Sequence, residues 1–311
     1  MLTSAVYLLK KAASLYLNNF AVIFKYLLLT LIPTLIVVFA FWIPSVFSEN
    51  FYFAMLAGWW WLFCLTGAAI AILVLALGMW FSFNIMRVIK KLYHGETIVP
   101  VLETTKETEK ILWKGIGTSL LAGLYVAGPF VMGVLLLIIN MVYTNPATTV
   151  LLLQTMPFVR TTMSVSAFLV KFGGVFTFYL GLFLTLYGAV HAIVLSIKLF
   201  PALYETVLAE KPINESIKNS LTMTKNRWWA ILGRLLLSGL VVWVVYILAS
   251  LLLTLLVWTV FKIFGSTGNA VANLTYNVLT QILSLLITPV PFAVAIILYE
   301  ELKKLGPAQE T

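Results

Sequence analysis

The sequence predicts an all-α integral membrane protein with six transmembrane helices and additional amphipathic helices at the cytoplasmic surface. Three observations lead to this fold class. The chain is 62% hydrophobic and only 10% charged, whereas soluble domains are about 45–50% apolar and about 25% charged. It contains six long runs without charges, and its basic residues gather on one side when these runs are threaded through a membrane.

The six predicted spans follow from length, because a transmembrane helix needs about 20 predominantly apolar residues. The predicted spans, each built around one of these charge-free runs, lie at about residues 21–44, 59–84, 115–141, 172–197, 231–261 and 275–299. The helix-breaking cluster TNPATT, residues 144–149, follows the third span, and the cluster GSTGN, residues 265–269, precedes the sixth. The apolar stretch VLLLQTMPFV, residues 150–159, is too short to span and is expected to be interfacial or re-entrant. Residues 1–311 are therefore predicted to form a single integral membrane domain.

The basic residues set the expected orientation. With the N-terminus in the cytoplasm, 17 of the 20 basic residues lie inside, and only Arg160, Lys171 and Lys262 lie outside. This asymmetry satisfies the positive-inside rule and predicts a multi-pass protein of the cell membrane with both termini cytoplasmic. Ten of the 11 glutamates also lie inside, so the cytoplasmic excess is 17 − 10, or +7. That charge suits anionic lipid headgroups, and its placement at span ends argues against nucleic acid as a partner.

Two surface helices are predicted, at about residues 3–18 and 212–226. In the second, Ile213, Ile217 and Leu221 recur at helical spacing behind Pro212, which favours a first helical position. This helix is expected to lie on the inner leaflet and to lead into the fifth span at two tryptophans. The candidate headgroup or interface residues are Lys218, Lys225, Arg227, Trp228, Trp229 and Arg234.

A third cytoplasmic segment, VLETTKETEKILWK, has a similar place before a span. Three repeats of a surface helix and a hairpin, near 1–90, 97–200 and 205–300, would explain this layout. The alternative is that the three inner-leaflet segments share a pattern without being repeats.

The stretch LFPALYETVLAEKPINESIKNSLTMTKNRWWAILGRLLLSGLVV resembles the YciC-like proteins and the membrane domain found beside glycerophosphoryl diester phosphodiesterases. Their shared pattern is a span that ends in proline, then glutamate, a short helix with serine, and a basic and aromatic junction. In this chain the pattern falls on Pro201, Glu205 or Glu210, Ser216 or Ser220, and Lys225–Trp229. The resemblance implies a six-span membrane part, with the phosphodiesterase chemistry belonging to a separate catalytic domain.

The residue inventory argues against an enzyme. Metal-assisted phosphodiester hydrolysis needs clustered carboxylates and usually histidines, yet the chain has no aspartate and only two histidines, His94 and His191. Its one cysteine, Cys64, lies in an apolar run and excludes a multi-cysteine metal site. No catalytic residue, metal or cofactor is predicted. His94 lies in a cytoplasmic turn and is expected to be solvated.

Polar and helix-breaking residues within the spans suggest structural roles and one pathway. Glu205 is expected to form an ion pair with a base such as Arg234, and Asn84, Asn140 and Gln281 to form hydrogen bonds between helices. Pro289 and Pro291 should bend the sixth span, and broken helices frame substrate sites in transporters. The candidate pathway residues are His191, Gln281, Pro289 and Pro291.

The function predicted from these observations is a non-enzymatic membrane module that binds lipid or supports a partner protein. The expected partners are anionic membrane lipids, and either another membrane protein or a second copy of this chain. The alternative is a small transporter or permease subunit with a path near spans four and six.

Overall fold

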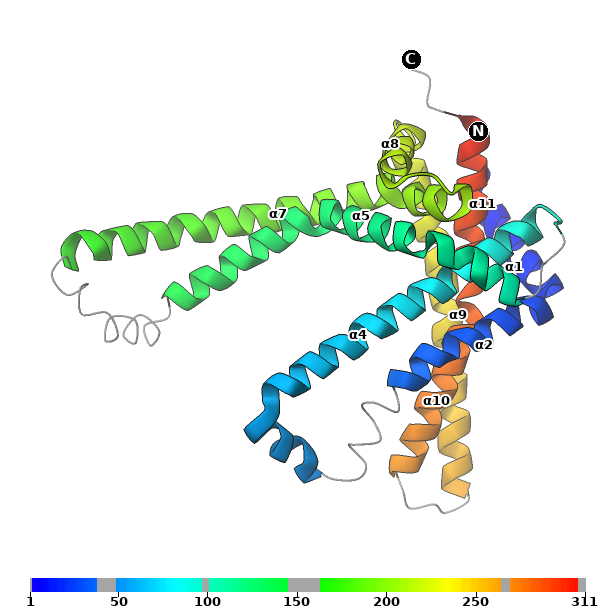
Figure 1. Ribbon diagram of the computed structural model, residues 1–311, viewed down its shortest axis with the longest axis horizontal. Helices are drawn as coiled ribbons and strands as arrows, with labels where there is room; N and C mark the ends of the chain where they lie inside the picture. Colours follow the sequence, from blue (N-terminus) through cyan, green and yellow to red (C-terminus); the bar gives the residue numbers. More distant parts are fainter. Residues whose placement is uncertain (1, 38–48, 97–100, 145–162, 264–268, 307–311) are drawn as a thin grey trace. The chain divides into compact units, whose positions relative to one another are not determined.

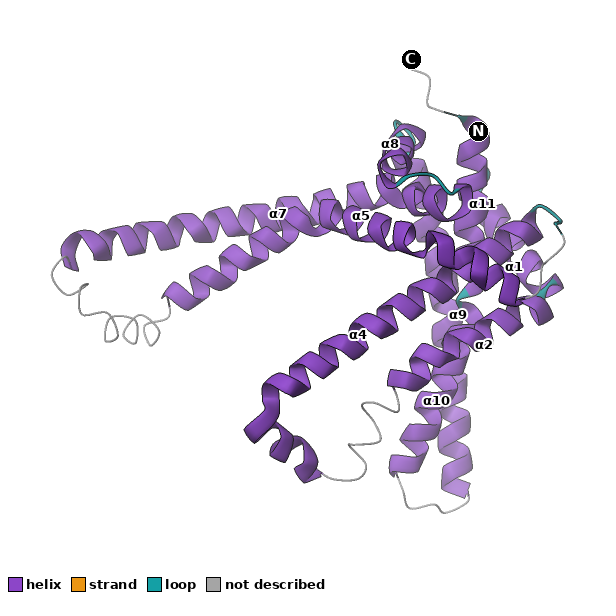
Figure 2. Cartoon of the chain, viewed as in Figure 1, coloured by secondary structure: helices purple, strands orange, loops and turns teal. Residues whose placement is uncertain are grey.

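A computed structural model describes residues 2–37, 49–96, 101–144, 163–263 and 269–306. Within these residues the secondary structure is helical, with short turns and no strand (Figure 2). This confirms the all-α fold class. The helices are α1 (Ala5–Asn18), α2 (Phe20–Val37), α4 (Glu49–Tyr93), α5 (Val101–Thr144), α7 (Met163–Ala209), α8 (Ile213–Thr224), α9 (Trp228–Ile263), α10 (Asn269–Ile287) and α11 (Pro289–Leu305) (Figure 1).

Five helical segments of the described chain are long and apolar enough to cross a membrane, and there are six if α1 and the start of α2, bent by 84°, count as one span. The five are Gly67–Tyr93, Glu103–Met141, Gly174–Ala209, Trp228–Ile263 and Thr275–Leu305. They fall within or overlap five of the predicted spans. The end of the predicted first span, residues 38–44, and the short run 150–159 lie outside the described residues. The membrane boundaries of each span remain predictions.

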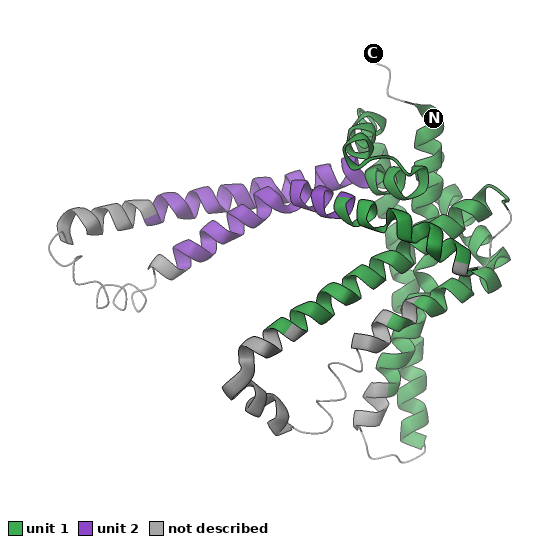
Figure 3. Cartoon of the chain, viewed as in Figure 1, with its two compact units in different colours: residues 1–117, 201–311 green, residues 118–200 purple. Residues whose placement is uncertain are grey.

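The described chain divides into two compact units, coloured separately in Figure 3: residues 1–117 with 201–311, and residues 118–200. In unit 1, α11 is the central helix, because it contacts α1, α4, α8, α9 and α10. Eight consecutive residues of α11, Ala293–Glu300, are buried. A helix buried on all sides needs neighbours around its whole circumference, and these five helices provide them.

The two predicted surface helices are present as α1 and α8, although α8 packs differently from the expectation. Its buried residues are Ser216, Ser220 and Thr224, a stripe of small hydroxyl side chains at four-residue spacing. Small residues let helices approach closely. The apolar stripe of Ile213, Ile217 and Leu221 is less buried than this hydroxyl stripe, since Leu221 is exposed. This leaves an apolar edge of α8 for the membrane surface, where its position remains a prediction.

Unit 2 is a helix pair formed by parts of α5 and α7 that pack through glycine. A β-carbon at Gly188 would lie 2.4 Å from the backbone nitrogen of Phe130, and one at Gly133 would lie 2.4 Å from that of Thr185. The Asn140 side chain donates to the Gly174 carbonyl and to Thr177 Oγ1, the latter at 2.9 Å. The predicted interhelical role of Asn140 is therefore confirmed.

The proline pair interrupts the last span as predicted. Helix α10 ends at Ile287 and α11 begins at Pro289, with Thr288 between them. Prolines have no N–H, so Pro289 and Pro291 provide no donor for the carbonyls four residues earlier. Thr288 closes the hydrogen-bond ladder of α10, because its N–H and its hydroxyl both donate to the Ser284 carbonyl, at 3.0 and 2.7 Å.

Candidate functional site

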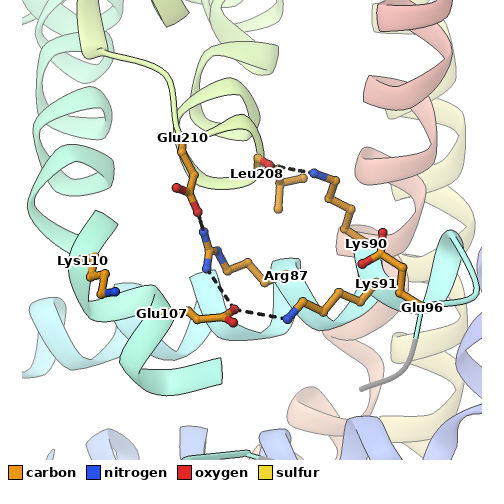
Figure 4. Close-up of a pocket in the computed structure, with 8 residues that line it drawn as sticks. All are labelled: Arg87, Lys90, Lys91, Glu96, Glu107, Lys110, Leu208 and Glu210. Carbon is orange, nitrogen blue, oxygen red and sulfur yellow. Dashed lines mark hydrogen bonds and ion pairs between the residues drawn. The ribbon is translucent and has the colours of Figure 1, made fainter. Parts of the chain in front are cut away.

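Charged residues of unit 1 converge where α4 ends, α5 begins and α7 ends. The centre of this cluster is Arg87 of α4, which is 9% exposed. Its Nη1 lies 3.4 Å from Glu107 Oε2 of α5, and its Nη2 contacts Glu210 just beyond α7 (Figure 4). Lys91, one turn further along α4, also reaches Glu107, at 3.2 Å. Arg87 thus connects α4 with carboxylates from two other parts of the chain.

The same cluster caps the C-terminal end of α7. Arg87 Nε donates to the Val207 carbonyl at 3.3 Å, and Lys90 Nζ donates to the Leu208 carbonyl at 2.7 Å. Cations at this end of a helix satisfy its last carbonyls and offset its dipole. Glu210 follows in the left-handed conformation, with φ of 58°, which is the usual way for a helix to terminate.

These residues surround a cavity of about 420 Å³, here called the Arg87 pocket. Its lining is Arg87, Lys90, Lys91, Glu96, Glu107, Lys110, Leu208 and Glu210. Four of these side chains are basic and three are acidic. Lys110 is the basic residue that the dashed contacts of Figure 4 leave out, and in the described part of the chain it has no hydrogen bond or ion pair. The pocket therefore combines a buried guanidinium with an available ammonium group.

A second polar centre of unit 1 surrounds Glu205, whose side chain is fully buried. Its carboxylate accepts a hydrogen bond from Tyr299 at 2.8 Å and pairs with Lys211 at 2.8 Å. The Asn219 amide of α8 lies at 3.4 Å. The hydrogen bond to Glu205 holds the pKa of Lys211 above its ordinary value. The predicted ion pair is confirmed, but its partner is Lys211 and not Arg234.

Arg234 instead holds the start of the chain. Its guanidinium donates to the carbonyls of Thr3 at 2.5 Å and Leu2 at 2.8 Å, and to Ala230 within its own helix. Arg227 has a similar contact with the other end of the described chain, where its Nη1 donates to the Gly306 carbonyl at 2.9 Å. Arg227 and Arg234, two of the six candidate headgroup residues, therefore donate hydrogen bonds to backbone carbonyls within the protein.

Replacing Arg234 by glutamine is expected to free the N-terminal segment. Hydrogen bonds to a charged donor contribute about 1.5–3 kcal/mol, so amide hydrogen exchange in residues 2–8 should be about tenfold faster or more. Hydrogen exchange of the detergent-purified protein measures this directly. Lys262→Gln, at the opposite end of α9, is the control and should leave this segment unchanged. Equal amide hydrogen-exchange rates for residues 2–8 in the wild type and in Arg234→Gln would show that Arg234 does not hold the N-terminal segment.

The other candidate headgroup residues are open to the surroundings. Lys218 and Lys225 are exposed, and Trp229 is 69% exposed. Trp228 stacks on Trp229 with ring centroids 4.0 Å apart and is half-buried. A basic and aromatic surface of this kind is typical of the membrane–water interface.

The candidate pathway residues belong to different units. His191, in unit 2, is half-buried and stacks on Tyr187, with ring centroids 5.6 Å apart. In unit 1, Gln281 is exposed on α10 and forms no hydrogen bond to another helix among the described residues, contrary to the expectation, and Pro289 is buried. Pro291 lines a groove of about 260 Å³ beside residues of α9 and α10, among them Trp243.

Two further predictions concern single polar residues. Thr108 of α5 donates to Asn84 of α4 at 2.7 Å, which confirms the interhelical role of Asn84. His94 is exposed, as expected for a solvated turn, and its Nε2 also lies 3.7 Å from Glu300 Oε2 of α11. Among the described residues, no group of three or more histidine, cysteine, aspartate or glutamate side chains is placed to hold a metal ion.

Sequence reasoning overlooked the Arg87 pocket. One signal was available, because Arg87, Lys90 and Lys91 stand at helical spacing at the end of a span, where basic side chains share one side of the helix. The two acidic partners of Arg87 lie 20 and 123 residues away. Nothing in their local sequence connects them with Arg87.

Long apolar helices with exposed apolar side chains, charged residues at their ends and hydrogen-bonded polar residues between them define a multi-pass helical membrane protein. Residues 181–309 match the family described as the membrane domain of glycerophosphoryl diester phosphodiesterase. The match runs from α7 to the end of α11 and confirms the resemblance seen in residues 199–242. No curated protein and no solved structure matches the chain.

Proposed function

We propose that this protein is a non-enzymatic module of the cell membrane, with both termini cytoplasmic, that binds anionic lipid at the end of unit 1 that carries α8. The observation that carries the proposal is the exposed set of Lys218, Lys225 and Trp229 around the junction of α8 and α9. Each basic residue near an anionic surface contributes about 1 kcal/mol, and an exposed tryptophan adds affinity for the interface.

Five acidic residues of the same unit are engaged in contacts away from Lys218 and Trp229. Glu205 and Glu215 pair with Lys211, and Glu301 accepts bonds from the backbone and hydroxyl of Thr3. Glu107 and Glu210 pair with Arg87. These five acids are held in contacts within unit 1, which supports a surface that attracts anionic headgroups.

The test is lipid selection by the intact chain. The protein is purified in a mild detergent, offered equal amounts of phosphatidylglycerol and phosphatidylcholine, and analysed by native mass spectrometry. Phosphatidylglycerol is expected to be retained about fivefold more than phosphatidylcholine. The double variant Lys218→Gln/Lys225→Gln should lose most of this preference.

Lys262→Gln provides the matched control, because this exposed lysine lies at the other end of α9. It should retain the wild-type preference. Retention of the two lipids in equal amounts by the wild-type protein would refute the proposed function.

A transporter is the second candidate, favoured by the groove beside Pro291 at the interrupted helix. Transporters place substrates where helices are broken within the membrane. Substrate-dependent flux in proteoliposomes that falls in Pro289→Ala and His191→Ala variants would support this candidate. Absence of flux together with selective lipid retention would support the module.

A further inference from the structure

The Arg87 pocket has the composition of a site for a phosphate group. We propose that it holds the phosphate of an anionic lipid headgroup, which replaces the carboxylate of Glu210 on Arg87 and also binds Lys110. This inference rests on the proposed function and assigns a specific site to it, one that contains none of the residues at the α8–α9 junction.

Arg87 is preorganised to bind an oxyanion. Its side chain is 10% exposed, and its Nε is anchored on the Val207 carbonyl at 3.3 Å, which leaves two terminal nitrogens directed to acceptors. A planar guanidinium matches two oxygens of a phosphate as well as it matches carboxylates. In this structure the acceptors come from two different residues, Glu107 and Glu210.

Glu210 is the acceptor that an incoming anion can replace. Its side chain is 61% exposed, against 45% for Glu107, and Glu107 is also held by Lys91 at 3.2 Å. The Glu210 carboxylate is therefore the more solvent-accessible of the two acceptors. An incoming phosphate can take its place without leaving the buried guanidinium unpaired, which would be costly.

The charge balance then favours an anion. With Glu210 turned away, the pocket is lined by four basic residues and two acidic ones, Glu96 and Glu107. Lys110 of α5 lines the same pocket (Figure 4) and has no partner of its own among the described residues. Arg87 and Lys110 can thus bind different oxygens of one phosphate.

Volume and position agree with a lipid headgroup. The cavity of about 420 Å³ lies within the range of small-ligand sites, about 300–1,000 Å³. Three of its basic residues, Arg87, Lys90 and Lys91, lie in the last two turns of the segment Gly67–Tyr93. The end of a membrane-spanning segment is at the depth of the headgroups.

The experiment compares four single variants of the full chain with the wild type. Dioctanoyl phosphatidylglycerol, a soluble anionic phospholipid, is titrated into detergent-purified protein, and native mass spectrometry gives its Kd. Lys110→Gln is expected to raise the Kd about fivefold by removing one charged contact. Glu210→Asn is expected to lower the Kd about threefold because it removes the competing carboxylate. Asparagine tolerates the left-handed backbone conformation of residue 210, so this variant should remain folded.

Lys106→Gln is the matched control, since Lys106 lies one turn before Lys110 on α5 but does not line the pocket. Its Kd should stay within about twofold of the wild-type value. Sodium phosphate, added as competitor at the lipid concentration, separates the two sources of phosphate. Weak competition assigns the site to a lipid, whereas competition as strong as that of the lipid assigns it to soluble phosphate.

Two results would overturn the proposal: equal losses in Lys106→Gln and Lys110→Gln, or a Kd that rises in Glu210→Asn. A second variant, Glu210→Gln, repeats the charge removal with the original side-chain length, and no gain in affinity in either variant also refutes the exchange. These outcomes differ from failure of the proposed function, in which the wild-type protein already shows no preference for phosphatidylglycerol over phosphatidylcholine.

Discussion

Replacing Gly188 by alanine is expected to separate the two helices of unit 2 and to destabilise the protein by about 3 kcal/mol, at the upper end of the range for overpacked sites. The new β-carbon would lie 2.4 Å from Phe130 N, 2.6 Å from Phe130 Cα and 2.8 Å from Pro129 C. All three are backbone atoms, so α5 and α7 have to move apart as helices. Thermal unfolding in detergent, followed by far-UV circular dichroism, measures the loss.

Gly123→Ala on α5 is the control with the opposite sign. No heavy atom lies within 4 Å of a β-carbon built at Gly123. Alanine there improves helix propensity by up to about 1 kcal/mol and should leave stability unchanged or raise it. Gly133→Ala should resemble Gly188→Ala, because its β-carbon would meet Thr185 N at 2.4 Å. Similar midpoints for all three variants would refute glycine-mediated packing in unit 2.

Replacing Glu205 by alanine is expected to destabilise unit 1 by about 3–5 kcal/mol, the usual cost of breaking a buried ion pair on one side. The change leaves Tyr299 and Lys211 without the oxygens that each contacts at 2.8 Å. The same unfolding measurement detects it. The double variant with Lys211→Ala should lose less than the sum of the two single changes, because the residues interact directly.

Glu215→Ala is the matched control. Glu215 also pairs with Lys211, but at 3.7 Å and with a side chain that is 53% exposed. Exposed pairs of this spacing contribute about 0.3–0.5 kcal/mol, so its effect should be small. A loss in Glu215→Ala as large as that in Glu205→Ala would show that burial is not what makes the Glu205 contact important.

The pH dependence of this contact follows from Lys211. Its pKa is raised in the folded protein by the hydrogen bond to Glu205. A base with a raised folded pKa contributes its stabilisation fully below its ordinary pKa, and the contribution is lost as pH rises through the folded value. The difference between wild type and Glu205→Ala should therefore be constant near neutral pH and shrink in strongly alkaline solution.

Helix positions were predictable because they depend on local sequence. In a membrane every backbone polar group needs an internal partner, so a long apolar run adopts a helix whatever surrounds it. Asn84 and Asn140 were placed between helices for the same reason, since a buried amide needs hydrogen-bond partners. The interruption at Pro289 follows from the missing N–H of proline.

The partners of charged residues were not predictable in this way. The sequence pointed to an ion pair for Glu205 but to the wrong base, because Arg234 and Lys211 are both basic residues near the same end of a span. Only folding places Arg234 against the carbonyls of Leu2 and Thr3, more than 230 residues away in sequence. The Arg87 pocket likewise depends on Glu210, 123 residues from Arg87.

Helix α8 shows the same division within one element. Its apolar spacing at Ile213, Ile217 and Leu221 predicted an amphipathic helix, and the helix is present. The sequence did not indicate that the hydroxyl side chains of Ser216, Ser220 and Thr224 would be buried. They are buried because this side of α8 packs against other helices. The sequence by itself determined the helical membrane architecture, because apolar length and backbone hydrogen bonding act within each segment. The tertiary structure alone decided which side chains meet in the Arg87 pocket and at Glu205, because those contacts join segments whose separation along the chain leaves no local signal.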